Sequence, residues 1–551
     1  MRRSPRTAPP SKVRSGPRGW KRHLPQWRPD PIAWLIATCG AVLFTAFSVS
    51  QWRGFIAPSW DLGIFTQLAQ QYAHLETPIV DIKGPGYNLL GDHFHPILIL
   101  LGPVFRLFPS GLSLLVLQGL LFAWSSVPVT RLARQRLGGM WGSLLGVGYI
   151  VSWELAGAVA AQFHEIAFAV PLLAFGLVHW IEGKHRIACI EIGLLVFVKE
   201  DLGLTVAAFG LILLWIDWGE TAAGEQERAR GSVGSTNTSV DDVVSSSQAA
   251  PSPEAPSEAS FVSASAPYPP FPLRTWRSLR ATLTSWHQTP SAYMILWGLF
   301  WFVISIAVIL PLFNPHGGWD YTDRLSETQD TAPGLLGFFT GLLGPGEKMV
   351  TLMLLAFSAG LVGLRSPVLW LMVPTLAWRF AGNVPYYWGW DWHYSAVLIP
   401  IATVALIDGV ERLRISQRLR EAWKRRVVPL AVLCAVVPSA AMMWNGPMGS
   451  FLRGTNDFHL LDREAGEAAV AEVGTGSAVV ADFRMLAYVV PGNTVYWEGT
   501  VADAYVDTLI VGPGHEALSS PAGPQSWASE EYGGVWTVAF SDADFLVLKR
   551  P

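Results

Sequence analysis

The sequence predicts an all-α polytopic membrane domain followed by a small external α/β domain. Of the 551 residues, 51% are hydrophobic and 15% are charged, whereas a soluble domain carries about 25% charged residues. Apolar runs near or above the roughly 20 residues that cross a bilayer recur along the chain. Near residue 446 this pattern gives way to short β-type runs separated by Gly and Pro, which sets the last domain apart.

The N-terminus is basic before it becomes apolar. Residues 1–29 contain many Arg and Lys, several Pro and no acid, so we expect residues 1–30 to form a disordered cytoplasmic tail. The apolar run that starts at Ile32 is long and lacks a clear cleavage site. It is interpreted as a signal anchor that stays attached. Because Cys39, Cys189 and Cys434 all lie in apolar segments, a disulfide framework is not expected.

Arg and Lys orient the chain, since cytoplasmic loops carry an excess of both. Basic clusters occur at 131–136, 184–186, 274–280, 365 and 412–426. Placing them inside predicts about eleven helices, with the N-terminus inside and the C-terminus outside. The predicted spans are 32–50, 111–130, 140–160, 166–182, 187–198, 201–217, 291–313, 348–364, 366–380, 395–409 and 428–444.

The remaining segments complete the predicted organisation. The N-terminal membrane region covers 31–218 and includes a first external loop, 51–95, with helical periodicity over 62–75. Residues 219–273 are rich in Ser, Ala and Pro and are predicted to be a disordered cytoplasmic linker. The C-terminal membrane region covers 274–445 and opens with a basic amphipathic helix, 274–288, on the inner leaflet.

Residues 446–551 are predicted to form the extracytoplasmic α/β domain. A helix is expected over 462–473. The strand-like runs are 477–481, 494–497, 507–511 and 544–549.

Polar side chains gather on the outer side of this topology, which predicts an outward-facing cleft. The candidates are Asp61, Asp92, His93, His95, His164, Glu165, Lys199, Glu200, Asp201, Asp320, Asp391 and His393. "KED" at 199–201 falls between two apolar segments. Ionisable groups at membrane depth are expensive and usually line a cavity.

Each candidate also has a purely structural interpretation. Asp61 can be the N-cap of a helix that begins at Leu62. Asp92 and its neighbouring His residues can be polar loop groups at the membrane–water interface. Glu165 can lie near a helix start, where its negative charge interacts favourably with the helix dipole. The run "YYWGWDWHY" at 386–394 can be an aromatic belt. Carboxylates and imidazoles are good metal ligands, but no H-E-x-x-H pattern occurs, so a divalent cation stays open and no metal ligand is assigned.

Four motifs in this order resemble a known family. They are "WDLGIF" at 60–65, "GDHFHPILILLGPVF" at 91–105, "FHEIAFAVPLL" at 163–173 and "KEDLGL" at 199–204. They resemble a family of predicted bacterial polytopic membrane proteins with a domain of unknown function, strongly over 55–215 and more loosely beyond. That family implies no particular reaction.

A more distant similarity is to the C-type glycosyltransferase superfamily, which includes protein O-mannosyltransferases and aminoarabinose transferases. The shared features are a basic N-terminus, one helix, and a long external loop with an acid just after that helix. Asp61 matches that acid, and His95-Pro96 resembles the start of the next helical segment. Asp61 is followed by Leu62 and is not part of a paired Asp-x-Asp, so the resemblance does not imply metal dependence.

The resemblance implies a membrane glycosyltransferase that uses a polyprenyl-phosphate-linked sugar at the outer face of the cell membrane. Asp61 would be the base, and Asp92 and Glu165 would complete the catalytic set. Lys199 would face the lipid phosphate. The other substrate-binding residues would be His93, His95, His164, Glu200, Asp201, Asp391 and His393. The expected partners are membrane lipid, the lipid-linked donor and an envelope acceptor, with no nucleic acid.

Two other functions stay open. The buried "KED" also suits a transporter or flippase of a lipid-linked or polar solute, although most of the acids lie in predicted external loops and no internal repeat supports alternating access. A non-catalytic envelope assembly protein would use the external C-terminal domain for binding.

Overall fold

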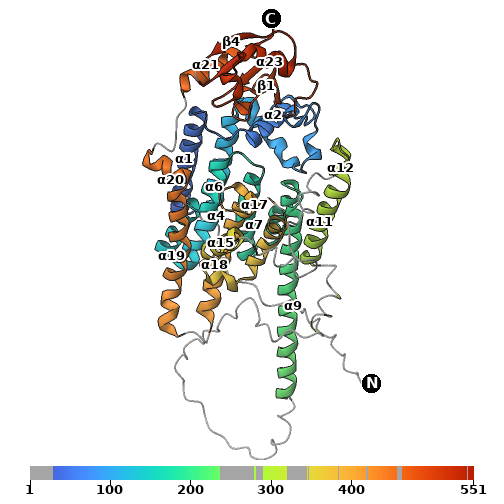
Figure 1. The fold of residues 1–551 in the computed structure, drawn as a ribbon. Coiled ribbons are helices and arrows are strands. Elements are labelled where there is room, and N and C mark those ends of the chain that lie inside the picture. Colours follow the sequence, from blue (N-terminus) through green and yellow to red (C-terminus); the bar gives the residue numbers. More distant parts are fainter. Residues whose placement is uncertain are drawn as a thin grey trace, which may run out of the picture.

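The structure is a computed structural model that describes residues 29–235, 289–318, 346–382, 384–416, 420–455, 462–542 and 544–551, with single positions at 278, 280, 284 and 344. Most of the predicted tail, linker and inner-leaflet helix lies outside the described residues, as does Asp320. The described part is mainly helical, with one small sheet near the C-terminus (Figure 1).

The helices fall into an N-terminal group and a C-terminal group on either side of the undescribed segment after residue 235. The first group is α1 (Pro31–Arg53), α2 (Trp60–His74), α3 (Leu101–Leu107), α4 (Gly111–Leu137), α5 (Gly139–Ile150), α6 (Trp153–Ala161), α7 (Ile166–Ile181), α8 (His185–Gly193) and α9 (Leu202–Ser235). The second is α11 (Pro290–Ile304), α12 (Leu310–Phe313), α15 (Gly346–Ser358), α16 (Val373–Ala381), α17 (Pro385–Trp388), α18 (Leu398–Ile415), α19 (Glu421–Asn445) and α20 (Pro447–Arg453).

Short 3₁₀ and π turns interrupt or join these helices. The 3₁₀ turns are η1 (Asp81–Lys83), η2 (Leu89–Gly91), η3 (Pro96–Leu100), η4 (Leu194–Phe197), η8 (Val362–Arg365), η9 (Pro367–Met372), η10 (His393–Ser395) and η11 (Glu516–Ser519), and η7 (Ser305–Ile309) is a π-helical turn.

Six helical stretches of the described chain are long and apolar enough to cross a membrane by length and composition. They are Pro31–Arg53, Gly111–Leu137, Gly139–Ala161, Leu202–Gly219, Pro290–Phe313 and Glu421–Asn445. Each coincides with a predicted span. Ile166–Ile181 is apolar but shorter, and the predicted spans over 348–380 are broken into α15, η8, η9 and α16. The total of eleven and the orientation stay predictions.

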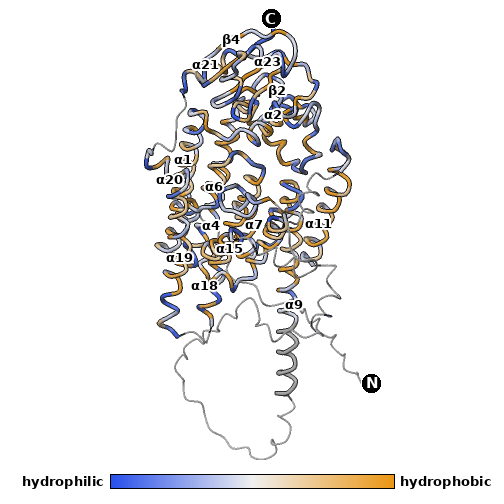
Figure 2. The backbone as a smooth tube through the Cα atoms, viewed as in Figure 1, coloured by the Kyte–Doolittle hydropathy of each residue, from blue (hydrophilic) through white to orange (hydrophobic). Residues whose placement is uncertain are grey.

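Apolar side chains on α11 show how the helical part meets lipid. Only 17% of an apolar 18-residue stretch within Pro290–Phe313 is buried inside the protein. Leu296, Phe300 and Val303 in this stretch are exposed. Figure 2 shows the hydrophobic residues concentrated along the helices. Side chains of this kind on a soluble surface would form an aggregation-prone patch, so we interpret this face as lipid-facing.

α9 differs from the prediction at its C-terminal end. The disordered linker was expected from residue 219, but α9 continues to Ser235. The sequence "ETAAGEQERAR" explains the difference, because Ala, Glu, Gln and Arg are strong helix formers. At the other end, α9 packs closely on α11: a Cβ on Gly298 would lie 2.3 Å from the Gly203 carbonyl oxygen, so both positions require a small residue.

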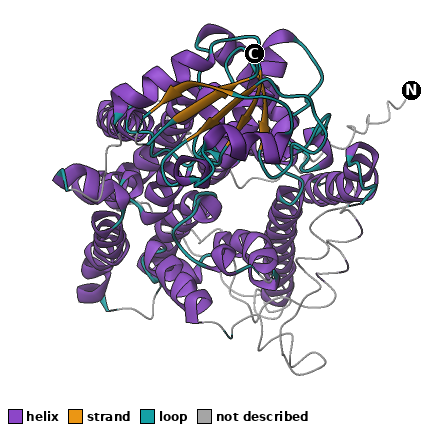
Figure 3. Ribbon diagram, turned by 45° about the horizontal axis from the view of Figure 1, so that its top comes forward, coloured by secondary structure: helices purple, strands orange, loops and turns teal. Residues whose placement is uncertain are grey.

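The C-terminal region contains a sheet of five strands among the described residues (Figure 3). The strands are β1 (Ala478–Ala481), β2 (Thr494–Trp497), β3 (Thr508–Val511), β4 (Thr537–Ser541) and β5 (Leu546–Lys549), in the order β2-β1-β3-β5-β4. β1 is parallel to β2 and β3, and β5 is antiparallel to β3 and β4. The nearby helices are α21 (Arg463–Val473), α22 (Leu486–Val489) and α23 (Pro524–Tyr532).

Alternate strand residues pack into two cores. Val479, Ile510 and Val547 belong to the main core, which continues into the membrane helices. Val480 and Leu509 belong to a separate core on the other face of the sheet. The period-2 alternation of strand side chains explains this division.

Helix α2 is fixed to the C-terminal region by hydrogen bonds between residues far apart in sequence. The Ala487 N–H donates to Ser59 Oγ at 2.9 Å. Gln67 Nε2 donates to the Val495 carbonyl at 3.1 Å, and Gln67 Oε1 accepts from the Ile82 N–H at 3.1 Å. A Cβ on Gly63 would lie 2.8 Å from Leu486 Cβ. The first loop and the sheet therefore form one packed layer over the helical bundle (Figure 1).

Candidate functional site

Glu165 lies at the centre of a buried ionic cluster. It occupies the junction between α6 and α7, and its side chain is 0% exposed. Lys199 Nζ lies 3.0 Å from Glu165 Oε1, and His164 Nδ1 lies 2.6 Å from Glu165 Oε2. His164 is held in place because its backbone N–H donates to Gln118 Oε1 at 3.0 Å. An isolated buried carboxylate is expensive, so the Lys199 ammonium group is the counter-charge that stabilises Glu165.

The loop that carries "GDHFHP" docks on the "KED" turn before α9. His93 Nδ1 lies 2.8 Å from Glu200 Oε1, and the Phe94 N–H donates to Glu200 Oε2 at 3.0 Å. Asp92 Oδ2 lies 3.2 Å from Lys83 Nζ. Burial acts to raise the pKa of Asp92, but the positive charges of His93 and Lys83 outweigh it and hold that pKa below its usual value.

His95 is buried and Asp201 is half-buried beside these pairs. His95 is 1% exposed, and its ring lies edge-on to the Phe65 ring at 6.1 Å. Its Nδ1 and Asp201 Oδ1 have no hydrogen-bond partner among the described residues. Buried polar atoms without partners are rare in folded proteins and call for an explanation.

Asp61 approaches the cluster from the first turn of α2. Gln162 Nε2, just beyond α6, donates to Asp61 Oδ2, and the Leu62 N–H donates to Gln162 Oε1 at 3.2 Å. Burial raises the pKa of Asp61, with the Glu165 and Asp92 charges adding to the effect and His164 and Lys199 opposing it. Asp61 therefore lies within electrostatic reach of the ion pairs.

The capping interpretation of Asp61 is wrong in this structure. α2 begins at Trp60, with Ser59 at the N-cap position. Ser59 does not cap through its side chain, because its hydroxyl accepts from Ala487 instead. Asp61 belongs to the first helical turn, where a carboxylate is still favoured by the helix dipole.

His393 reaches the cluster from the opposite half of the chain. Its ring stacks on that of His164, with the centroids 3.6 Å apart. His393 is 3% exposed, and neither of its ring nitrogens has a partner among the described residues. Asp391, two residues earlier, is exposed and has Glu347 as its charged neighbour, so it lies apart from the cluster.

A small cavity of about 20 Å³ lies between His393 and Lys199. The residues that line it are Ile166, Lys199, Asp201, Leu202, Thr375, Trp378, His393, Tyr394 and Val397. Trp378 Nε1, Asp201 Oδ1 and both His393 nitrogens lack partners among the described residues. A cavity of this volume holds about one water. Its unpaired donors and acceptors make it suitable for a polar ligand group.

The structure adds residues that sequence reasoning missed. Trp378, Tyr394 and Thr375 line the cavity, and Gln162 holds Asp61. Arg379 is 0% exposed and builds the loop that carries His393, since it donates to the carbonyls of Tyr387 at 2.8 Å and Gly389 at 3.0 Å. The dense aromatic run at 386–394 was the only signal in the sequence for this part.

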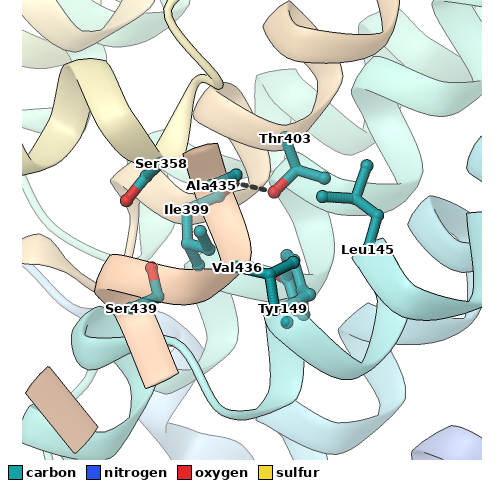
Figure 4. Close-up of a pocket in the computed structure, with 9 residues that line it drawn as sticks. Leu145, Tyr149, Ser358, Ile399, Thr403, Ala435, Val436 and Ser439 are labelled. Atoms are coloured by element: carbon teal, nitrogen blue, oxygen red, sulfur yellow. Dashed lines mark hydrogen bonds between the residues drawn. The ribbon is translucent and has the colours of Figure 1, made fainter. Parts of the chain in front are cut away.

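A second cavity lies between α5, α15, α18 and α19 (Figure 4). It is lined by Leu145, Gly148, Tyr149, Ser358, Ile399, Thr403, Ala435, Val436 and Ser439, and measures about 10 Å³. The hydroxyls of Thr403 and Tyr149 are satisfied by the Ile399 carbonyl and by Ser125. No charged group lines it, so it is less suited to chemistry than the cavity beside His393.

Within the described ranges, no three His, Cys, Asp or Glu side chains are grouped as a metal-binding set. Glu165 and Glu200 are instead engaged by Lys199, His164 and His93.

The comparisons with known proteins give one family match. Residues 55–498 match the family described as "Predicted membrane protein (DUF2079)". No curated protein matches the chain significantly.

Among solved structures, ArnT from Cupriavidus metallidurans bound to undecaprenyl phosphate aligns with a TM-score of 0.43 and 11% identity, over 93% of this chain and 98% of that chain. Its apo state gives 0.42 and 11%, with the same coverage. An oligosaccharyltransferase from Archaeoglobus fulgidus, tethered with an acceptor peptide, gives 0.41 and 11%, over 93% of this chain and 73% of that chain.

Proposed function

The chain belongs to the DUF2079 family of predicted membrane proteins, and we propose that it is a membrane glycosyltransferase that uses a polyprenyl-phosphate-linked sugar. The observation that carries the proposal is the hydrogen-bonded connection of Asp61, through Gln162 and Gln118, to the Lys199–Glu165–His164 cluster. A reaction that moves a proton from an acceptor hydroxyl and releases an anionic phosphate needs a base and a nearby cation.

Asp61 acts as the general base. The acceptor hydroxyl gives its proton to the Asp61 carboxylate as its oxygen attacks the anomeric carbon. The bond from that carbon to the phosphate oxygen breaks, so the configuration inverts and the polyprenyl phosphate leaves with the electron pair. The burial of Asp61 supports this role because it raises the pKa of the carboxyl, and a base works best when its pKa lies nearer the working pH.

Lys199 stabilises the departing phosphate. An ammonium group carries three N–H donors, and the ion pair of Lys199 Nζ with Glu165 Oε1 at 3.0 Å leaves donors for a phosphate oxygen. Glu165 Oε2 also lies 2.6 Å from His164 Nδ1, so Lys199 is not the only side chain that faces this carboxylate. His393 and Trp378 supply further unpaired polar atoms at the same cavity.

The remaining cluster residues position the substrates. His93, Glu200, Asp92 and Lys83 hold one another in pairs and so fix the loop that faces Lys199. His95 and Asp201 each offer an unpaired atom. The proposal places this site and the C-terminal domain on the outer side of the membrane. A tag added after Pro551 should then be accessible in intact cells, and an inaccessible tag would contradict this orientation.

The test uses full-length protein in proteoliposomes with radiolabelled polyprenyl-phosphate sugars of several hexoses and pentoses. The expected result is release of polyprenyl phosphate and sugar transfer to a water-soluble or lipid acceptor. If wild type turns over no donor but moves a lipid-linked solute across the vesicle, the transporter alternative replaces this proposal. If it does neither, a non-catalytic role in envelope assembly stands.

A further inference from the structure

An aromatic cluster lies at the carboxyl ends of the parallel strands and includes Trp60, the residue before Asp61 in α2. It consists of Trp60 from α2, Phe483 after β1 and Trp497 at the end of β2. The ring centroids of Trp60 lie 5.0 Å from Phe483 and 4.9 Å from Trp497, and Phe483 lies 4.6 Å from Trp497. Phe483 is 48% exposed, although a ring of this size gains from burial.

Polar groups surround the cluster. Glu498 follows Trp497 directly and lies 2.8 Å from His515 Nε2, with the Glu498 side chain 29% exposed. Trp497 Nε1 is buried and has no hydrogen-bond partner among the described residues. The Trp497 ring rests on Gly499, where a Cβ would lie 2.3 Å from the ring, and this contact fixes the ring orientation.

We propose that Phe483, Trp497 and Trp60 form the platform that binds a neutral saccharide acceptor for Asp61. Aromatic rings carry a negative face that complements the C–H face of a sugar ring. The partly exposed Glu498 carboxylate provides an acceptor for sugar hydroxyls. Sites of this kind combine aromatic walls with a few polar groups. The carboxylates of Glu498 and Asp61 disfavour an anionic ligand. This inference rests on the proposed function, since it names the substrate class of the same site.

Trp60 and Asp61 contact different parts of the protein, and this difference favours the acceptor, and not the donor, as the ligand of the aromatic cluster. Trp60 contacts the sheet through Phe483 and Trp497, whereas Asp61 accepts from Gln162 in the helical bundle. A polyprenyl chain stays in the bilayer, so the donor approaches Asp61 from the helices and Lys199. The aromatic cluster on the sheet side is therefore left for the acceptor.

The test measures oligosaccharide binding without any donor. Full-length protein in lipid nanodiscs is titrated by calorimetry with maltotetraose, mannotetraose and arabinotetraose. At least one is expected to bind, and Phe483→Ala should weaken that binding roughly tenfold or more, as for a central aromatic contact. The matched control is Tyr505→Ala, which removes an aromatic ring that is 69% exposed before β3 and should bind as wild type does.

Several outcomes overturn the inference. One is that none of the three oligosaccharides binds to the protein. Another is that wild type and Phe483→Ala bind an oligosaccharide equally well while thermal unfolding shows that both proteins are folded. Photo-crosslinking separates a sugar platform from a lipid contact: with p-azidophenylalanine at position 483, adducts to the bound oligosaccharide support the inference, and adducts only to phospholipid overturn it. In the transfer assay, wild-type turnover with an acceptor KM that Phe483→Ala leaves unchanged removes this inference alone, whereas absent donor turnover removes the proposed function.

Discussion

Lys199 and Glu165 form a buried ion pair that joins the turn before α9 to the start of α7, with 3.0 Å between Nζ and Oε1. Lys199 is 12% exposed at its side chain and Glu165 is 0% exposed. Truncating one partner of such a pair leaves the other charge buried and uncompensated. The pair therefore has to be tested with both residues changed.

Lys199→Met should destabilise the protein by about 3–5 kcal/mol, because Glu165 loses a counter-charge in a buried site. The double variant Glu165→Gln/Lys199→Met should recover most of that stability, since both charges are removed together. Transfer from the polyprenyl-phosphate donor should stay low in the double variant. Thermal unfolding and donor turnover measure the two effects, and a stable double variant with wild-type turnover would exclude Lys199 as the phosphate partner.

Asp61→Asn should lower sugar transfer by roughly 10²–10⁴, the usual effect of losing a general base. The variant keeps a side-chain oxygen that can accept from Gln162, so thermal unfolding should change little. The matched control is Glu154→Gln, because Glu154 is a buried carboxylate that accepts from Ser358 Oγ at 2.6 Å and lies in the first turn of α6, at the end away from Gln162. Full activity of Asp61→Asn would show that Asp61 is not the general base, and Asp92 and Glu165 would then be the candidates for that role.

The pH profile should report the raised pKa of Asp61. Only the carboxylate form can accept a proton, so kcat/KM should fall as the pH drops through that pKa. Since burial raises the pKa, the acid limb should lie above the ordinary range of an aspartate near 3.8. Donor turnover measured from acidic to neutral pH checks this, and an acid limb at or below the ordinary aspartate range would contradict a raised pKa of Asp61.

Gln67→Ala should loosen α2 from the sheet. Gln67 bonds both the Val495 carbonyl and the Ile82 N–H, and leaving buried partners unsatisfied costs about 1–3 kcal/mol. Stability should fall by this amount, and amide hydrogen exchange over 492–497 should accelerate. Gln71→Ala, at a partly exposed position of the same helix, is the control. Equal exchange in the two variants would show that α2 is held by other contacts.

The sequence by itself determined the membrane character, the helical class and most elements of the C-terminal region. Long apolar runs mark the six candidate spans, and local periodicity placed α21, β1, β2, β3 and β5 close to their observed bounds. β4 was missed because most of its residues are exposed, so it has no alternating apolar pattern. The motif residues were also readable, since ionisable groups beside apolar segments stand out.

Only the tertiary structure decided which of those residues meet. The pairs Glu165–Lys199, His93–Glu200 and His164–His393 join segments far apart in the chain. Packing between helices sets such contacts, and no local sequence period encodes them. Packing also decides that His393 stacks on His164 in the cluster whereas Asp391, only two residues away, is exposed. Tertiary contact also bears on the start of α2, because Ser59, two residues before Asp61, bonds to Ala487 in the C-terminal region.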